Sequence, residues 1–406
     1  MSGQAIGRRF KRWFWRPPRP HGETIHNRTV SFLELFYDLA YVVVVGQAAG
    51  HLAEHVSVRG FVEFAVVFAL IWIAWVNGSL YLELHAREDG RTRTIVFVQM
   101  VVIALLAVFT ADATEASGAA FALVYAGLLT VLTWLWHTVR GQDRLDRPEF
   151  LAVTGAYVLG GSVSVGIIFG SAFLPVVPRL IVWGGFALAW IVSILLLTRR
   201  ARGNLSGGVT PTHSLVERFG LFTIIVLGEV VLGVVDGLSV ATHDVKTIST
   251  GLIALMLGFG FWWMYFDVVG RRLPRNDGGA LTHWLLSHFP VTLSIAAAGS
   301  AMVSLIGHAG EASTPASTAW LLAGAVAMGL LALIVTERAL VDAERLAAVY
   351  QPLTSAMAGA AAAAILIGWV RPVPWLLALL LVTILSVLWF FVVIRFLRAD
   401  AWGQEQ

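Results

Sequence analysis

The sequence of 406 residues contains no cysteine. This absence excludes disulfides, thiolate metal sites and cysteine nucleophiles. Charged residues are also scarce, at 13% of the chain against roughly 25% in a soluble protein. Walker A, HExxH, GxSxG and GxGxxG patterns do not occur in a context that fits them. We therefore expect no ATP-driven pump, no enzyme, no cofactor, no catalytic residues and no metal site.

Long apolar runs dominate what is present. The chain is 58% hydrophobic, and its mean hydropathy is +0.78. Twelve runs are long enough to cross a ~30 Å hydrocarbon layer, at about residues 31–50, 61–82, 94–111, 118–137, 150–170, 179–198, 214–236, 248–269, 284–307, 317–336, 352–370 and 373–395. The sequence therefore predicts an all-α integral membrane protein with about twelve transmembrane helices, and the lipid bilayer is its first partner.

The segments between these runs are short. The longest internal ones, at about 199–213, 270–283 and 337–351, are too short for a soluble domain with its own core. The first 28 residues have no apolar h-region or small-residue cleavage site, so no removable signal peptide is expected. The predicted organisation is a basic cytoplasmic tail at 1–28, a six-helix half at 29–198, a cytoplasmic linker at 199–213, a second six-helix half at 214–397 and a C-terminal tail at 398–406.

The distribution of basic residues predicts the orientation. If the N-terminus is cytoplasmic, 23 of the 28 Lys and Arg residues fall in cytoplasmic segments, as the positive-inside rule requires. The exceptions are Arg59, Arg179, Lys246 and Arg371 outside, and Arg218 within a helix. Both termini should then be cytoplasmic. The net charge of +3 follows from this topology, so a nucleic-acid partner is not needed.

Two stretches 183 residues apart carry the same polar pattern: Ser31, Glu34 and Phe36 match Ser214, Glu217 and Phe219. The offset is close to half the chain, which indicates two duplicated halves in a parallel pseudo-repeat. Outside these lead helices the repeat is weak. In the second helix of each half, Trp72 and Trp75 align loosely with Trp262 and Trp263.

Acidic residues inside the spans are candidate site residues, because a charge in a bilayer costs at least a few kcal/mol. Asp38 lies about 10 Å into its span at 1.5 Å per residue. Glu229 lies about 22 Å past Ser214, beyond the midplane, so burial should keep it protonated unless a cation is bound. The pair Gly46-Gln47 in the first half matches Gly228-Glu229, at an offset of 182 rather than 183, so the counterpart of Glu229 is the neutral Gln47. This asymmetry suits a substrate or ion site between the halves.

Glu34 and Glu217 have two interpretations. Each can be part of a capping box with Ser31 or Ser214, or it can bind a substrate or ion. Arg218 needs a carboxylate partner, and Asp38, Glu34 and Glu217 are the candidates. This pair is either structural or part of the site.

Three further residues are candidate proton-relay groups: His213, His288 and Asp267. His titrates near neutral pH, and His288 precedes Pro290 deep in its span. For His213 an interfacial position is the alternative. Trp262, Trp263, Tyr265 and Phe266, next to Asp267, indicate an aromatic belt first and a gate second. The glycines at 220, 228, 233 and 237 predict close helix packing.

These segments resemble a known family. The sequence ELFYDLAYV (34–42) is similar to the ELFFDLVFV-type opening of bacterial low temperature requirement A (LtrA) proteins. HSLVERFGLFTIIVLGE (213–229) resembles that family's second signature, and FWWMYFD (261–267) with the segment 283–288 resembles a third. The resemblance covers about residues 29–395, and the variants at Tyr37, Ala40 and Tyr41 affect no functional residue. It implies a multi-pass protein of the bacterial cytoplasmic (inner) membrane, linked by name to growth in the cold, and no particular substrate.

A weaker resemblance is to the lysosomal and bacterial potassium-channel family, whose six-helix units open with an FSD motif. Phe36, Tyr37 and Asp38 match it in part, because the Ser is absent and the second half has no Asp after Phe219.

The functional hypothesis is a proton-coupled secondary transporter of a small solute. Asp38 and Glu229 would be the titrating or ion-binding carboxylates, and Arg218 would be their counter-charge or an anion ligand. The alternative is a cation or proton channel whose pore is lined by the two lead helices. The sequence is compatible with a homo-oligomer as well as with a monomer.

The predicted topology can be tested with single cysteines, since the chain has none of its own. Cysteines at positions 116 and 312 should react with a membrane-impermeant maleimide in intact cells, because both lie in predicted outer loops. A cysteine at position 205, in the predicted cytoplasmic linker, should react only after the cells are opened. Labelling of position 205 in intact cells would overturn the orientation.

Overall fold

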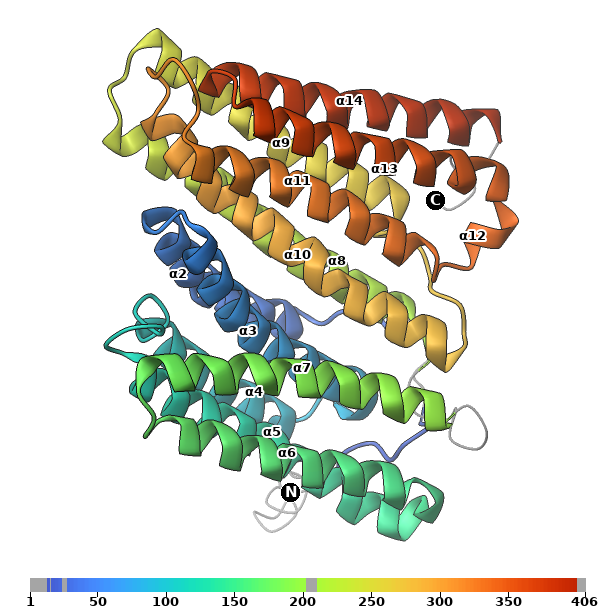
Figure 1. Cartoon of the computed structure of the whole chain (residues 1–406). Coiled ribbons are helices and arrows are strands. Elements are labelled where there is room, and N and C mark those ends of the chain that lie inside the picture. Colours follow the sequence, from blue (N-terminus) through green and yellow to red (C-terminus); the bar gives the residue numbers. More distant parts are fainter. Residues whose placement is uncertain (1–12, 15, 24–27, 202–209, 400–406) are drawn as a thin grey trace, which may run out of the picture. The chain divides into compact units, whose positions relative to one another are not determined.

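The computed structural model describes residues 13–14, 16–23, 28–201 and 210–399, which form helices and short connections (Figure 1). The twelve long helices are α2 (Phe32–Glu54), α3 (Val58–His85), α4 (Gly90–Val108), α5 (Gly118–Asp146), α6 (Leu151–Ser171), α7 (Val176–Ala201), α8 (His213–Val240), α9 (Val245–Val268), α10 (Gly278–Gly307), α11 (Ala316–Glu337), α13 (Ala347–Val370) and α14 (Pro374–Arg398). A 3-10 helix (Pro148–Phe150) and the short α12 (Asp342–Arg345) complete the described part, which contains no β-strand.

Each of the twelve predicted spans coincides with one of these long helices. The helices are long and apolar enough to cross a membrane. The predicted all-α class is therefore confirmed, and the chain is a multi-pass membrane protein. The agreement arises because a span is a local property, set by the length of an apolar run. The division into two repeated halves stays a prediction.

The chain contains two compact units. Unit 1 comprises Met1–Val44, Ala69–Ser193 and Arg200–Thr210, and unit 2 comprises Val45–Phe68, Ile194–Arg199 and Pro211–Gln406. The division passes through α2, α3 and α7, so each of these helices has residues in both units. Within unit 1, α5 packs against α4 and α6. Within unit 2, α10 packs against α8 and α11, α11 packs against α13, and α9 packs against α14.

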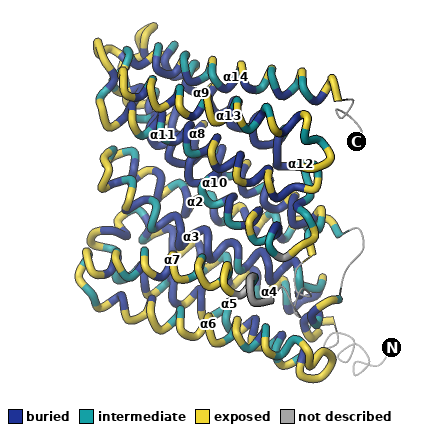
Figure 2. Tube along the Cα trace, turned by 45° about the vertical axis from the view of Figure 1, so that its right-hand side comes forward, coloured by how far each residue is buried: buried dark blue, intermediate teal, exposed yellow. Residues whose placement is uncertain are grey.

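Burial differs sharply between helices (Figure 2). In the most apolar stretch of α10, 78% of the residues are buried, whereas in that of the span containing α6 only 11% are buried. The exposed side chains of the outer helices are themselves apolar, such as Leu159 on α6 and Leu366 on α13. In a membrane protein, apolar side chains of this kind face lipid tails, which are as apolar as the protein interior.

Helix ends in unit 2 are fixed by side-chain caps. Asp244 accepts the N–H of Thr247 at the start of α9, and Asp277 accepts that of Ala280 at the start of α10. These hydrogen bonds lower the pKa of both carboxyl groups, because they stabilise the charged form. At the start of α8 the cap is Thr212, whose hydroxyl accepts the N–H of Leu215.

The cap at Thr212 bears on one of the two interpretations of Glu217. A capping box with Glu217 would make Ser214 the N-cap residue, but Ser214 lies within the first turn of α8. Thr212 has the extended backbone that an N-cap requires, with φ −117° and ψ 155°. The first half matches its prediction: Ser31 and Glu34 form the reciprocal pair of a capping box.

Glycines bring α8 and α10 into backbone contact. A methyl group on Gly233 would collide with the carbonyl oxygen of Gly299, and one on Gly299 would lie 2.6 Å from the carbonyl oxygen of Glu229. Gly237 likewise packs against Ile306. The predicted role of these glycines in close packing is therefore confirmed for Gly233 and Gly237. It is wrong for Gly228, where a methyl group would meet nothing within 4 Å.

Two variants on one helix test this contact. Gly233→Ala should lower the thermal midpoint of the protein in detergent, because overpacking at a close contact typically costs about 1–3 kcal/mol. Gly228→Ala is the matched control, and it should keep or raise the midpoint, since alanine favours a helix by up to about 1 kcal/mol. The midpoint can be measured as the loss of the monodisperse chromatographic peak after heating. Equal midpoints for the two variants would contradict the contact.

Candidate functional site

Glu229 is a buried carboxyl group inside unit 2. It lies on α8 with 5% of its surface exposed, 16 residues from the start of the helix and 11 from its end. Its Oε1 atom accepts no hydrogen bond from any residue that the structure describes. A buried carboxylate normally collects donors, because the interior does not replace the water it has lost. Glu229 therefore lacks, at Oε1, the donor that a buried carboxyl oxygen normally has.

The backbone of α2 passes close to this carboxyl group at Gly46. A methyl group on Gly46 of α2 would lie 3.3 Å from Oε1 of Glu229, which is a tight contact, so the carboxyl group would have to shift slightly to make room for it. One turn further along α2, a methyl group on Gly50 would meet nothing within 4 Å. Beside them, Ser300 of α10 donates to the carbonyl oxygen of Ala49 at 2.8 Å, which ties α10 to this part of α2.

Asp38, the other predicted intramembrane carboxylate, lies in unit 1 and is buried. Its Oδ1 atom accepts the indole N–H of Trp75 at 2.9 Å, which joins α2 to α3. In the same turn of α2, the hydroxyl groups of Tyr37 and Tyr41 are 3.1 Å apart. Asp38 thus has the dedicated donor that a buried carboxylate requires.

Glu34 takes part in a polar network at the start of α2. Besides its capping bonds with Ser31, it pairs with Arg28, which also pairs with Glu83 of α3. Three of the other predicted residues, His213, Glu217 and Gln47, are exposed. The contacts of Glu34 with Ser31 and Arg28 favour a structural role for it. A binding role for Glu34 or for the three exposed residues stays a prediction.

Arg218 is fully buried on α8, eleven residues before Glu229. At 1.5 Å per residue, the two positions are about 16 Å apart along the helix. The predicted pairing of Arg218 with Asp38, Glu34 or Glu217 stays a prediction.

His288 is held by two neutral partners. Its Nδ1 atom lies 2.7 Å from the carbonyl oxygen of Trp284, and its Nε2 atom lies 3.1 Å from the hydroxyl of Tyr265. Because a carbonyl group only accepts, Nδ1 carries the proton, and in the neutral ring Nε2 accepts from Tyr265. Phe219 and Trp284 pack against the same ring. The relay role of His288 stays a prediction.

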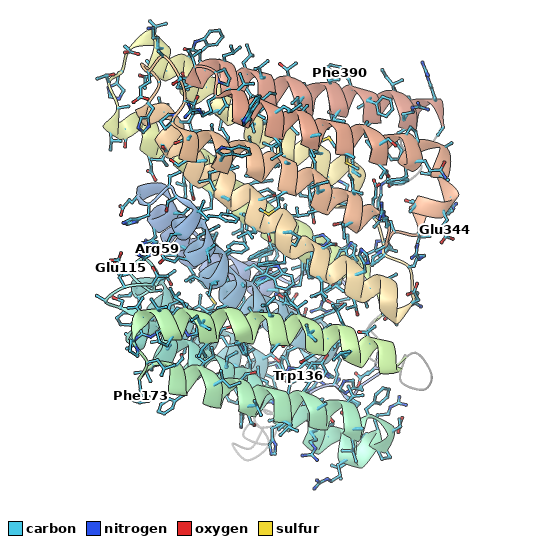
Figure 3. All side chains as sticks on the ribbon, viewed as in Figure 1. Arg59, Glu115, Trp136, Phe173, Glu344 and Phe390 are labelled. Atoms are coloured by element: carbon cyan, nitrogen blue, oxygen red, sulfur yellow. The ribbon has the colours of Figure 1, made fainter. Side chains whose placement is uncertain are left out.

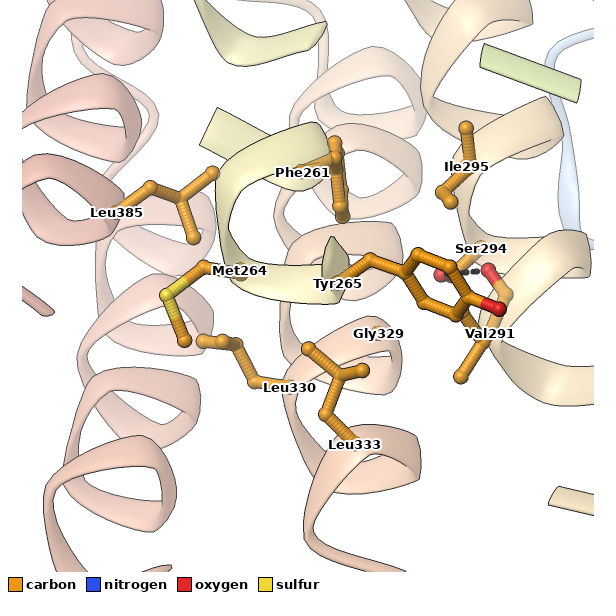
Figure 4. Close-up of a pocket in the computed structure, with 10 residues that line it drawn as sticks. All are labelled: Phe261, Met264, Tyr265, Val291, Ser294, Ile295, Gly329, Leu330, Leu333 and Leu385. Carbon is orange, nitrogen blue, oxygen red and sulfur yellow. Dashed lines mark hydrogen bonds between the residues drawn. The ribbon is translucent and has the colours of Figure 1, made fainter. Parts of the chain in front are cut away.

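Tyr265 also lines a small cavity between α9, α10, α11 and α14, with Ser294, Gly329 and Leu385 on the other walls (Figure 4). The cavity has a volume of about 10 Å³, which is close to the space of one water molecule. Tyr265 and Phe266 are buried, so the interpretation of these two as an aromatic belt is wrong. The packing of α9 against α10 decides which way the side chains of Tyr265 and Phe266 point. This packing cannot be inferred from the order of residues in the sequence.

Asp267, near the end of α9, is bound by a tryptophan. Its Oδ2 atom accepts the indole N–H of Trp389 of α14 at 2.8 Å, and Trp389 stacks on Trp263 with ring centroids 4.7 Å apart. This arrangement fixes α14 against α9. The predicted relay role of Asp267 stays a prediction.

A buried polar cluster in unit 1 was missed by the sequence analysis. The ring and backbone N–H groups of His21 both reach the carboxylate of Asp143 on α5, at 2.8 and 3.1 Å. His85 at the end of α3 approaches the carbonyl oxygen of Arg19 at 2.8 Å, and Trp136, labelled in Figure 3, packs edge-on against His85. A segment of the predicted basic tail is thus folded into unit 1.

We call residues 16–23 the strap. Arg19 is buried there, and its guanidinium group donates to the carbonyl oxygens of Glu83 and Ala86 at 2.5 and 2.8 Å. Arg19 is therefore not at a lipid surface. The prolines at 17, 18 and 20 and the turn at Gly22, where φ is +76°, were the available signal. They mark a fixed turn within the predicted basic tail.

The strap can be tested with Pro18→Cys, which places the only thiol of the chain at a buried position. Adding Asp143→Ala should raise its maleimide reactivity in inside-out vesicles by about tenfold or more, because two hydrogen bonds of about 1 kcal/mol each are lost. Asp146→Ala is the matched control, since Asp146 is exposed on the same helix. Unchanged reactivity with Asp143→Ala would show that Asp143 does not hold the strap.

Comparisons with known proteins agree with the family resemblance. The chain is 24% identical over 257 residues to an uncharacterized protein of Rhizobium meliloti (strain 1021), and the alignment covers 60% of this chain and 60% of that protein. The chain thus spans less than two thirds of the length of this relative. The model of the family described as bacterial low temperature requirement A protein matches residues 29–387, which is most of the chain and includes every residue discussed in α2 to α13. The chain belongs to the bacterial low temperature requirement A (LtrA) family.

Proposed function

We propose that this LtrA-family protein is a proton-coupled secondary transporter of a small solute, and that Glu229 binds the coupling proton. The observation that carries the proposal is the carboxyl group of Glu229, which is 95% buried and has an oxygen without a donor among the described residues. In such a position the neutral acid is favoured over the charged form. A group that exchanges a proton there changes the charge of the site by a full unit.

The position of Glu229 along α8 supports a coupling role. It lies about 24 Å from the start of the helix and about 16 Å from its end, at 1.5 Å per residue. Within a hydrocarbon layer of ~30 Å, a proton reaches this depth only by a path through the protein. Access from one side at a time would then couple the proton to a change of conformation.

The contact with Gly46 supports conformational sensitivity. Because α2 meets the carboxyl group through a glycine, a small shift of α2 along α8 changes the space around Oε1. The carbonyl of Glu229 is held against Gly299 of α10. The carboxyl group therefore lies where three helices meet, and its protonation state bears on how they pack.

Helix neighbours recur in the two predicted halves, which supports a two-half carrier. In the first half, Trp72 of α3 contacts Trp190 of α7, and in the second half Trp263 of α9 contacts Trp389 of α14. The second and sixth helices thus pair through tryptophans in both halves. The fourth and fifth helices also pair in both, as α5 with α6 and as α11 with α13. Parallel repeats of this kind are typical of secondary transporters.

The test is Glu229→Gln in proteoliposomes with an internal pH dye and a panel of small solutes. Glutamine mimics the protonated acid, so the variant should fold and reach the membrane as the wild type does. Uptake driven by a pH gradient should fall to the level of protein-free liposomes, while solute exchange without a gradient is retained. Asp38→Asn should impair both modes, because it weakens the acceptor of the Trp75 indole. Wild-type pH-driven uptake by Glu229→Gln would reduce this carboxyl group to a structural role.

Matched controls are available in the same unit. Glu311→Gln removes an exposed carboxyl group in the loop after α10 and should leave uptake unchanged. Gly46→Ala places a methyl group 3.3 Å from the carboxyl oxygen and should slow uptake, whereas Gly50→Ala, with open space around it, should not. Saturable flux with counterflow marks a carrier. Currents far above a carrier's turnover would favour the channel alternative.

A further inference from the structure

A second buried carboxyl group lies in unit 2, at a position that the sequence analysis assigned to a loop. Glu337 is the last residue of α11, and only 2% of its surface is exposed. Its Oε1 atom accepts the hydroxyl hydrogen of Thr354 on α13. Its Oε2 atom is buried and accepts no hydrogen bond from any residue in the described part of the chain.

Two features of this position favour a bound positive charge. A carboxylate with one unsatisfied oxygen in an apolar interior is costly, and binding a proton removes that cost. The end of α11 adds the negative end of a helix dipole, which also stabilises positive charge nearby. One hydroxyl and one carboxyl group are too few oxygen ligands for a metal cation, which takes about six. A proton is therefore the better fit.

The other charged and titratable groups around this end of unit 2 are exposed or have partners of their own. Arg338 is exposed. The remaining groups are bound as follows: Arg272 to Asp342 at 2.7 Å, Asp267 to Trp389, Tyr350 to the carbonyl oxygen of Val268, and His288 to Trp284 and Tyr265. None of these contacts involves the carboxyl group of Glu337, whose hydrogen-bond partner is Thr354.

Two paired loops cover this end of the unit. The N–H of Arg275 donates to the carbonyl oxygen of Ala339 at 2.8 Å, and that of Val341 donates to the carbonyl oxygen of Leu273 at 3.1 Å. The ion pair of Arg272 and Asp342 joins the same two loops. The loops lie on the predicted cytoplasmic side, so Glu337 is next to the cytoplasm and yet buried.

We propose that Glu337 is a second proton-binding residue, from which the coupling proton leaves toward the cytoplasm. The proposal rests on the proposed function of Glu229. The helices α8, α9, α10 and α11 alternate in direction across the membrane, so the end of α11 lies on the side where α8 begins. Glu229 is about 24 Å along α8 from that side. The two carboxyl groups therefore lie at opposite depths of the same unit, as the entry and exit residues of a proton path require.

The experiment combines infrared difference spectroscopy of the purified full chain with uptake in proteoliposomes. A pH step should produce a carbonyl band of a buried, protonated carboxylic acid in the wild type, and Glu337→Gln should remove one component of it. Glu337→Gln should also reduce pH-driven uptake to the level of protein-free liposomes. Glu344→Gln is the matched control, since the side chain of Glu344 is 78% exposed in the neighbouring helix α12 (Figure 3). It should change neither the band nor uptake.

A second variant keeps the test independent of folding defects. Thr354→Val retains the carboxyl group and removes its hydroxyl donor, so it should keep the band but shift the pH at which the band appears. An unchanged band in Glu337→Gln, or wild-type uptake by that variant, would overturn the proposal. Failure of the proposed function is a different result: wild-type uptake by Glu229→Gln, with the band component still lost in Glu337→Gln.

Discussion

The hydrocarbon of a bilayer offers no hydrogen-bond partner, and this constraint governs the polar groups of the protein. Each polar side chain within a span must find its partner inside the protein. Asp38 does so with Trp75, Asp267 with Trp389, and Tyr125 with the carbonyl oxygen of Leu70. These bonds join neighbouring helices, so the requirement for satisfaction also fixes the packing.

Glu229 and Glu337 depart from this pattern. Both are buried, and each has an oxygen atom that no donor in the described residues reaches. An apolar residue of similar size would avoid the cost at either position. Natural proteins break local rules of this kind chiefly at functional sites. This is the physical reason for placing the coupling proton on these two residues.

The two units close one end of their helices in different ways. In unit 1 the strap is bound through Arg19 and through the contact of His21 with Asp143. In unit 2 two loops pair with each other and are joined by Arg272 and Asp342. In both units a buried or half-buried arginine makes several directed contacts, as its planar, multiply donating group allows. Basic residues that the positive-inside rule counts, such as Arg19 and Arg272, thus also stabilise the packing of their units.

The sequence alone determined the twelve spans and the family, because both depend on local runs and on motifs of adjacent residues. It also located Asp38, Glu229 and Asp267 within spans, but it placed Glu337 in a loop. Which of them lacks a donor was decided by the tertiary structure, since Trp75, Trp389 and Thr354 come from other helices. For the same reason Tyr265 was misplaced in a belt. A linear pattern specifies how deep a residue lies along its helix, whereas packing between helices specifies which way its side chain points and what it meets.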